Sequence, residues 1–340
     1  MSGKLIDRLV PALILIVLAT ACGGASTSAN VSGSDQPLNR PIEIGAAPDV
    51  LHQTPFQILP NVAKDKYGLD IEVKPFTRYP DIRTAIASGS LDVGVFGPND
   101  LVTLLGQGNS KVIAVAGYAT GGDYLMVRSG VTVNDWSDLN GLRMAVAQGG
   151  IGWMKLVASL QQHGVAYDAV KTTNLPSAPG MQDALSSKQV DAVQIWDPFG
   201  ASLAAKGLAY YPKFDIEHSD VLGAWNSIIV MTTDFASNHP KAASKVIEAV
   251  FDATHQMTSD LGTWAKVLSF TKLPTDTLIA AESHISYSPA LDQARLVKLA
   301  TFMYKLGIVP KDVSGEIAKA VDYQYVATAT GKSPQQLGAT

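Results

Sequence analysis

The chain is almost without cysteine, and this and other missing residue patterns exclude several classes of function. Its 340 residues include a single Cys, at position 22, so cysteine nucleophiles and cysteine-ligated metal sites are excluded from the rest of the sequence. Runs of Lys and Arg are also missing, and acidic residues outnumber basic ones 30 to 26, which excludes a nucleic-acid partner. The hydrolase and metalloprotease motifs Gly-x-Ser-x-Gly and His-Glu-x-x-His are absent, and the six histidines show no ligand spacing. We therefore expect no enzyme, no cofactor and no metal.

The amino-terminal segment has the pattern of an export signal. Two basic residues precede an apolar stretch, residues 9–19, that is too short to span a bilayer comfortably, and small residues then lead to Cys22. The sequence LATAC at 18–22 resembles the lipobox of bacterial lipoproteins, in which the Cys is diacylated. We expect residues 1–21 to be a lipoprotein signal peptide, with Cys22 lipidated and the protein anchored in the cell envelope on the extracytoplasmic side. An ordinary secretory signal with an incidental Cys is the alternative.

The rest of the chain divides by composition and by the alternation of its elements. Residues 22–40 are rich in Gly, Ser, Thr and Asn, which predicts a flexible tether. From Pro41 onward, short β-like runs alternate with helical stretches, the order that builds a parallel sheet covered by helices. The segments DIRTAIASGSLDV (81–93) and GMQDALSSKQVDA (180–192) resemble one another, which indicates two similar α/β lobes. We expect lobe I to comprise 41–122 and 224–340, lobe II to comprise 123–223, and the two crossings to lie near 121–127 and 222–230.

The elements follow from apolar runs and from Gly and Pro at their ends. Strands are expected at 42–46, 71–75, 92–96, 112–116, 142–147, 170–175 and 190–196, with a further one in the second crossing. Helices are expected at 55–67, 79–88, 153–163, 181–187, 240–257, 260–268, 290–306 and 315–325.

In open parallel sheets, ligands bind beyond the carboxyl ends of the strands, so the residues just after each apolar run are the candidates. The run VDAVQIWDPF ends in Trp196 and Asp197. Trp196 would give a flat apolar wall for a small organic solute, or would simply plug the base of a lobe. Asp197 would receive an ammonium or hydroxyl group of the solute, or would cap a helix that begins at Pro198.

Three further positions have both a binding and a structural interpretation. Arg78 follows a predicted strand, and its guanidinium suits a sulfonate, carboxylate or nitrate, but it also fits a solvated charge at a helix start. His52 would contact a solute or would pack or cap locally. Gly-Gly-x-Gly at 149–152 lacks the third glycine of a dinucleotide fingerprint and the Gly-Lys-Ser/Thr of a phosphate loop, so it predicts either a general anion site at a helix N-terminus or a mere turn.

Three segments carry a resemblance to a known family. ALSSKQVDAVQIWDPF, SDLNGLRMAVAQGG and IASGSLDVGVFGPND resemble segments of the extracytoplasmic solute-binding proteins of ABC importers, in the branch that serves alkanesulfonates, taurine, nitrate and thiamine-pyrimidine precursors. The resemblance spans about residues 41–313. It implies a type II periplasmic-binding-protein fold, two α/β lobes joined by two hinge crossings, that closes over one solute. Carried over position by position, it implies a ligand-binding set of His52, Arg78, Asn99, Gly150, Ile151, Trp196 and Asp197.

The function implied is that of a monomeric receptor that captures a small solute and delivers it to ABC permease subunits in the membrane. The Trp-Asp-Pro corner resembles the sulfonate binders, so a small anionic organic solute is expected. An aromatic or pyrimidine-type solute, framed by Trp153, Trp196, Trp225 and Tyr79, is the alternative, and so is a solute sensor without a transport role. A synthase of the thiamine-pyrimidine branch is disfavoured, because it would carry a cysteine cluster that this chain lacks.

Overall fold

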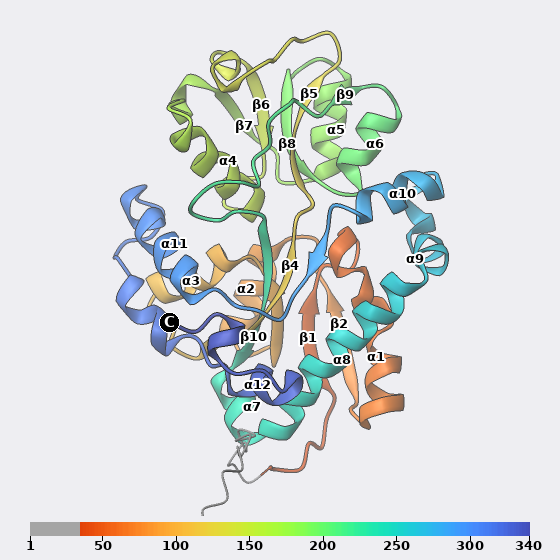
Figure 1. Ribbon diagram of the computed structural model, residues 1–340, viewed down its shortest axis with the longest axis vertical. Helices are drawn as coiled ribbons and strands as arrows, with labels where there is room; N and C mark the ends of the chain where they lie inside the picture. Colours follow the sequence, from red (N-terminus) through yellow and green to blue (C-terminus); the bar gives the residue numbers. More distant parts are fainter. Residues whose placement is uncertain (1–34) are drawn as a thin grey trace, which may run out of the picture.

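The computed structural model describes residues 35–340, which form two α/β lobes, each built on its own sheet (Figure 1). The predicted signal peptide, Cys22 and the first part of the tether lie outside the described residues. The strands of lobe I are β1 (Ile42–Ala46), β2 (Ile71–Pro75), β3 (Val93–Phe96), β4 (Val112–Thr120), β10 (Trp225–Thr232) and β11 (Ser286–Tyr287). The strands of lobe II are β5 (Asp123–Arg128), β6 (Arg143–Val146), β7 (Lys171–Asn174), β8 (Ala192–Trp196) and β9 (Ala209–Tyr210).

The two sheets share one topology. Their orders are β11-β4-β10-β3-β1-β2 in lobe I and β7-β6-β8-β5-β9 in lobe II. Strands β1, β2 and β3 of lobe I are parallel, and so are β6, β7 and β8 of lobe II, as predicted. One long strand in each sheet departs from the expected parallel arrangement: β10 runs antiparallel to β3 and β4, and β5 runs antiparallel to β8 and β9. The two-residue β11 at the edge of the lobe I sheet is also antiparallel to β4. β10 and β5 are the strands by which the chain enters from the opposite lobe, so each arrives from the other end of the sheet. The predicted α/β fold of two lobes joined by two crossings is confirmed.

The helices cover both faces of the sheets. In lobe II they are α4 (Ile151–Gln162), α5 (Ala178–Ser186) and α6 (Phe199–Ala205). In lobe I they are α1 (Leu59–Val62), α2 (Tyr79–Ala87), α3 (Pro98–Gly106), α7 (Thr233–Asn238), α8 (Pro240–Ser259), α9 (Leu261–Val267), α10 (Thr275–Glu282), α11 (Gln293–Lys305) and α12 (Gln324–Thr330). The long α8 lies across the sheet of lobe I, α9 follows it at the level of the junction, and α10 reaches the base of lobe II, where it packs on α6 (Figure 1). No helix of residues 35–340 is long and apolar enough to cross a membrane.

Two of the predicted helices are wrong in part. The helix expected at 55–67 is a 3-10 segment over 51–57, the short α1, and a π-helical turn over 63–67. Pro55 and Pro60 lack the N–H that a continuous helix requires at these positions. The helix expected at 315–325 is interrupted because residues 320–322 run beside β4, where the amide of Ala114 donates to the Ala320 carbonyl.

The internal similarity of the sequence corresponds to a repeated contact at the base of each sheet. In lobe I, the carboxylate of Asp92 accepts from the backbone amide of Glu43 at 3.0 Å and pairs with Arg40 at 2.6 Å. In lobe II, the carboxylate of Asp191 accepts from the backbone amide of Arg143 at 3.2 Å and pairs with its guanidinium at 2.7 Å. The Arg143 hydrogen bond holds the pKa of Asp191 below its usual range. An aspartate therefore joins β3 to β1 in lobe I, and an equivalent aspartate joins β8 to β6 in lobe II.

The end of the predicted tether is held on lobe I. The amide of Gln36 donates to the Asn238 carbonyl at 3.0 Å, and Arg40 forms the ion pair with Asp92 described above. A flexible tether is therefore not correct for this last part of residues 22–40.

The two crossings lie side by side. Gly121 donates its amide to the carbonyl of Ala224 on the other crossing at 2.7 Å. Gly121 and Gly122 both have φ of +86°, a left-handed conformation that favours glycine. Two successive residues of this kind separate β4 of lobe I from β5 of lobe II, and they are suited to absorb a rotation between the lobes.

Candidate functional site

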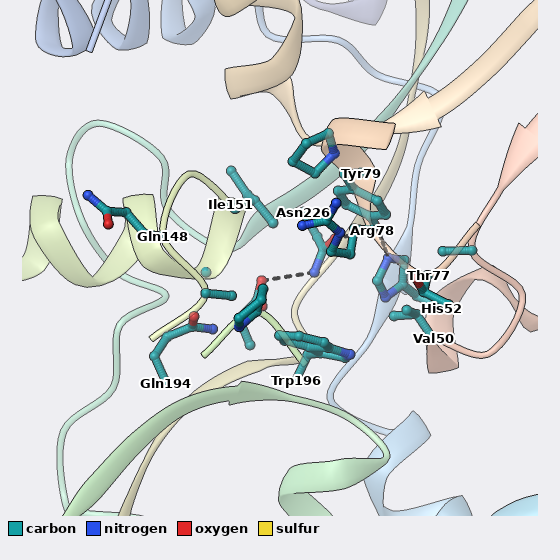
Figure 2. A pocket seen from close by; sticks show the side chains of 17 residues that line it. Val50, His52, Thr77, Arg78, Tyr79, Gln148, Ile151, Gln194, Trp196 and Asn226 are labelled. Atoms are coloured by element: carbon teal, nitrogen blue, oxygen red, sulfur yellow. Dashed lines mark hydrogen bonds between the residues drawn. The ribbon is translucent and has the colours of Figure 1, made fainter. Parts of the chain in front are cut away.

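A cavity lies between the lobes, at the carboxyl ends of their parallel strands, and residues of both lobes line it (Figure 2). Lobe I and the return crossing contribute Ala47, Val50, His52, Thr77, Arg78, Tyr79, Pro80 and Asn226. Lobe II contributes Asp123, Ala147, Gln148, Gly150, Ile151, Gly152, Pro176, Gln194 and Trp196. Five of the seven predicted ligand-binding residues are in this set, and Asn99 and Asp197 are not.

His52 faces the cavity as a neutral side chain. It is 2% exposed, and its Nε2 lies 2.6 Å from the hydroxyl of Tyr79. Burial, with the nearby positive charge of Lys155 acting in the same direction, lowers the pKa of His52 to about 3. The imidazole therefore contributes a hydrogen-bonding group but no charge at neutral pH.

Arg78 has a partner of its own. It precedes α2, and its guanidinium meets the carboxylate of Asp81 through Nε at 3.0 Å and Nη2 at 2.7 Å. The Arg78 side chain is 48% exposed, so the pair lies at the mouth of the cavity. An anionic solute would have to compete with Asp81 for this guanidinium.

Gly150 and Ile151 place the N-terminus of α4 against the cavity. Gly150 is the N-cap, no side chain in the described part of the chain caps the helix, and its first turn contains no acidic residue. The first backbone amides of a helix have no partner within the helix and carry its positive partial charge. Gly149, with φ of +85°, turns the chain sharply into this helix.

Trp196 ends β8 and forms part of the floor of the cavity in Figure 2. Its ring meets that of Phe199 edge to face, with the centroids 6.3 Å apart. Of the other aromatic residues considered for an aromatic solute, Tyr79 also lines the cavity. Trp153 faces away, because its indole N–H donates to the Tyr167 hydroxyl at 2.8 Å.

Asn99 and Asp197 join the lobes without lining the cavity. The amide of Asn99, at the start of α3, donates to the carbonyl of Gly149 in lobe II at 3.0 Å. Asp197 is 1% exposed, and its Oδ1 accepts from the amide of Ala201 in α6 at 3.0 Å, while its carbonyl accepts from the amide of Leu51 in lobe I at 3.3 Å. Burial raises the pKa of Asp197 to about 7. Asp197 thus accepts from the first turn of α6, which has Pro198 as its N-cap and begins at Phe199, one residue after the helix start expected from the sequence.

A buried ionic cluster lies behind the cavity and joins both crossings. The ammonium of Lys155 on α4 contacts Asp123 at 3.0 Å and Glu217 at 3.0 Å, and it donates to the Ala224 carbonyl at 3.2 Å. Burial alone would lower the pKa of Lys155, but the attraction of the two carboxylates outweighs it, so the pKa lies above its ordinary value. Asn226 donates to Asp123 at 3.0 Å and accepts from the Tyr79 hydroxyl at 3.3 Å. A chain of polar contacts thus runs from the lobe I wall to α4.

Sequence reasoning missed Gln194 and Lys155. Gln194 had a signal: it is the one polar residue within the apolar strand β8, and the two-residue period of a strand puts it on the same face as Trp196. Lys155 had no such signal, because its partners Asp123 and Glu217 lie far along the chain. Across residues 35–340, His, Cys, Asp and Glu form no group of three that would hold a metal ion.

Two lobes enclosing a cavity at their junction are the architecture of the periplasmic binding proteins, and solved structures with this fold match the chain. The alkanesulfonate-binding protein SsuA of Xanthomonas axonopodis pv. citri, bound to MOPS, has a TM-score of 0.73 at 20% identity, with 83% of this chain and 98% of that chain covered. The nitrate-binding protein NrtA of Synechocystis PCC 6803 has a TM-score of 0.70 at 15% identity, with 88% and 91% covered. At these identities the likeness shows the fold.

The family follows from the sequence comparison. The model of the NMT1-like family matches residues 40–269, and the chain belongs to this family. A protein of Brucella abortus that is named as a binding protein is 32% identical over 136 residues, which are 39% of this chain. This match spans 40% of the length of that curated relative.

Proposed function

We propose that the protein is a lipid-anchored receptor of an ABC importer, which captures a small anionic organic solute by closure of its two lobes. The observation that carries the proposal is the cavity itself, since both lobes supply its walls and the uncapped N-terminus of α4 faces it. The family and the fold shared with sulfonate- and nitrate-binding proteins support this function. The receptor acts as a monomer on the extracytoplasmic face of the membrane and delivers its solute to the permease subunits.

The cavity suits a solute with one anionic end and an apolar body. Among the described lining residues, the charged side chains are Arg78 and Asp123, and each is paired, with Asp81 and with Lys155. The backbone amides at the start of α4 are therefore the positive pole that remains for a sulfonate or carboxylate. Trp196 and Ile151 supply apolar surface for the rest of the solute.

An aromatic solute is the second candidate. Trp196 and Tyr79 line the cavity from opposite lobes, so a flat ring would contact an aromatic side chain on each side.

Closure follows from contacts with both lobes. A solute that touched only one lobe would bind the open and closed forms equally and would shift no equilibrium. Hydrogen bonds already cross between the lobes in this structure, among them those from Asn99 to Gly149 and from Leu51 to Asp197. Solute binding adds to these contacts, so the bonds that the solute makes to α4 and to the lobe I wall determine the population of the closed form.

A thermal-shift screen tests the receptor function. The purified mature protein is heated with alkanesulfonates, taurine, nitrate, aromatic carboxylates and pyrimidines, each in turn. A solute at 100 times its dissociation constant stabilises the protein by about 2.7 kcal/mol, a shift of several degrees. We expect the largest shift from an anionic organic compound. A protein whose melting temperature no compound in the panel raises is not a receptor for these solutes.

The anchor at Cys22 has a separate test. Cys22→Ser, expressed from the full-length gene, is expected to lose acylation and to move from the membrane fraction to the soluble fraction, since a diacylated Cys would be the attachment. Incorporation of a radiolabelled fatty acid and fractionation by centrifugation measure both effects. Ser26→Ala, four residues along the same segment, is the matched control and should remain acylated. Acylation of the Cys22→Ser protein would contradict the proposal.

A further inference from the structure

Gln194, at the wall of the proposed binding cavity, is a buried amide without a hydrogen-bond partner among the described residues. It lies in the middle of β8, is 1% exposed, and points among the lining side chains in Figure 2. Neither its Nε2 nor its Oε1 has a hydrogen-bond partner within residues 35–340. Buried side-chain amides in proteins are nearly always hydrogen-bonded, because an unpaired donor or acceptor loses its contact with water without replacement. Its chain neighbours in the strand, Val193 and Ile195, are apolar and fully buried.

The amide is placed against the start of α4. A Cβ atom on Gly152 would overlap the Gln194 amide and would approach Oδ1 of Asp123 to 2.6 Å. Because Gly152 has no side chain, the amide of Gln194 can occupy this space. The backbone amides at the α4 N-terminus and the side chain of Gln194 consequently border the same part of the cavity, and Trp196 lies on the same strand face two residues further on.

The two unpaired atoms have opposite requirements. Nε2 donates, so it would be satisfied by a sulfonate, carboxylate or carbonyl oxygen of a solute. Oε1 accepts, so it requires an N–H or O–H. A solute group that only accepts, such as a sulfonate or a nitrate, would satisfy one end of the amide and leave the other unpaired. A carboxamide satisfies both ends, because its carbonyl and N–H lie side by side and can meet a second amide in two parallel hydrogen bonds.

We propose that Gln194 is a specificity-determining residue, and that the solute carries an amide-type group, with donor and acceptor adjacent, in addition to its anionic group. The inference rests on the proposed receptor function and narrows its class of solute. Gln194 selects for the amide because a solute without the N–H leaves Oε1 buried and unpaired on closure.

A matched series of ligands tests this. Benzenesulfonate, 3-sulfobenzoate and 3-sulfobenzamide share a ring and a sulfonate and differ in one group. Calorimetric titration of the purified mature protein is expected to show that 3-sulfobenzamide binds at least tenfold more tightly than the other two. Equal affinity of benzenesulfonate and 3-sulfobenzamide, or tighter binding of the carboxylate, would overturn the role of Gln194 and leave the receptor function standing. Absence of binding by all three overturns the inference, and the receptor function then depends on the wider solute screen.

The variant Gln194→Met removes the amide and keeps a similar volume. It is expected to abolish the tenfold preference, and to leave the melting temperature of the ligand-free protein unchanged or raised, since no hydrogen bond is lost. Gln182→Met is the matched control: Nε2 of Gln182 donates to the Phe199 carbonyl at 3.0 Å, so its replacement lowers the melting temperature and leaves the preference intact. A Gln194→Met protein that keeps the preference, or that is destabilised as much as the control, shows that the amide has a structural role only.

Discussion

Replacing Trp196 by alanine is expected to weaken solute binding about 30-fold or more, while the free energy of unfolding of the ligand-free protein falls by about 1 kcal/mol. Large aromatic side chains at the centre of a binding site contribute about 2 kcal/mol or more to affinity, which corresponds to this factor. Trp196 is only partly buried, at the end of β8, so its removal leaves little unfilled core. Titration calorimetry with a solute identified in the screen, together with urea unfolding, measures both quantities.

Trp136 provides the control for this variant. It lies in lobe II outside the cavity lining, with its ring stacked on His163 at a centroid distance of 4.5 Å and against Phe214 at 4.4 Å. Trp136→Ala should lower stability and leave affinity unchanged. If Trp196→Ala keeps the affinity of the parent protein and loses stability as the control does, Trp196 is a plug of lobe II rather than a wall of the binding site.

The fold could be predicted largely from local patterns. Each parallel strand is a short apolar run, and the helices after β2 and β6 end before a glycine or a polar turn, so their places follow from neighbouring residues. The corner at Trp196 was visible for the same reason, since an aromatic residue at a strand's carboxyl end stands at the ligand-binding edge of such a sheet. The direction of β5 and β10 could not be predicted from local sequence, because it depends on where the chain enters from the other lobe.

The site itself depends on contacts between residues far apart in the chain. The candidates His52 and Arg78 are found from their places after strands, but the Tyr79 hydroxyl that holds His52 and the carboxylate that meets Arg78 come from the structure. The burial of Asp197 behind the cavity depends likewise on α6 and lobe I. The sequence shows which residues lie near the end of a strand. The direction in which each side chain points is fixed by packing in the folded protein.

The ionic cluster at the crossings joins solute binding to hinge geometry. Lys155 belongs to the helix whose N-terminus faces the cavity, yet its ammonium contacts Asp123 on one crossing and the Ala224 carbonyl on the other. Any tilt of α4 toward a bound solute therefore moves a charge on which both crossings depend. The two carboxylates also compensate the charge of the fully buried Lys155, and without the ammonium they would themselves be buried without compensation.

Lys155→Met is consequently expected to lower the free energy of unfolding by about 3 to 5 kcal/mol, the usual cost of removing one partner from a buried ion pair. Urea unfolding followed by tryptophan fluorescence measures the change. Lys206→Met, at an exposed position after α6, is the matched control and should change stability by about 0.5 kcal/mol or less. The double variant Lys155→Met, Asp123→Asn should recover part of the loss, because it removes one of the carboxylates left unpaired. A Lys155→Met protein as stable as the control would show that the cluster does not hold the crossings together.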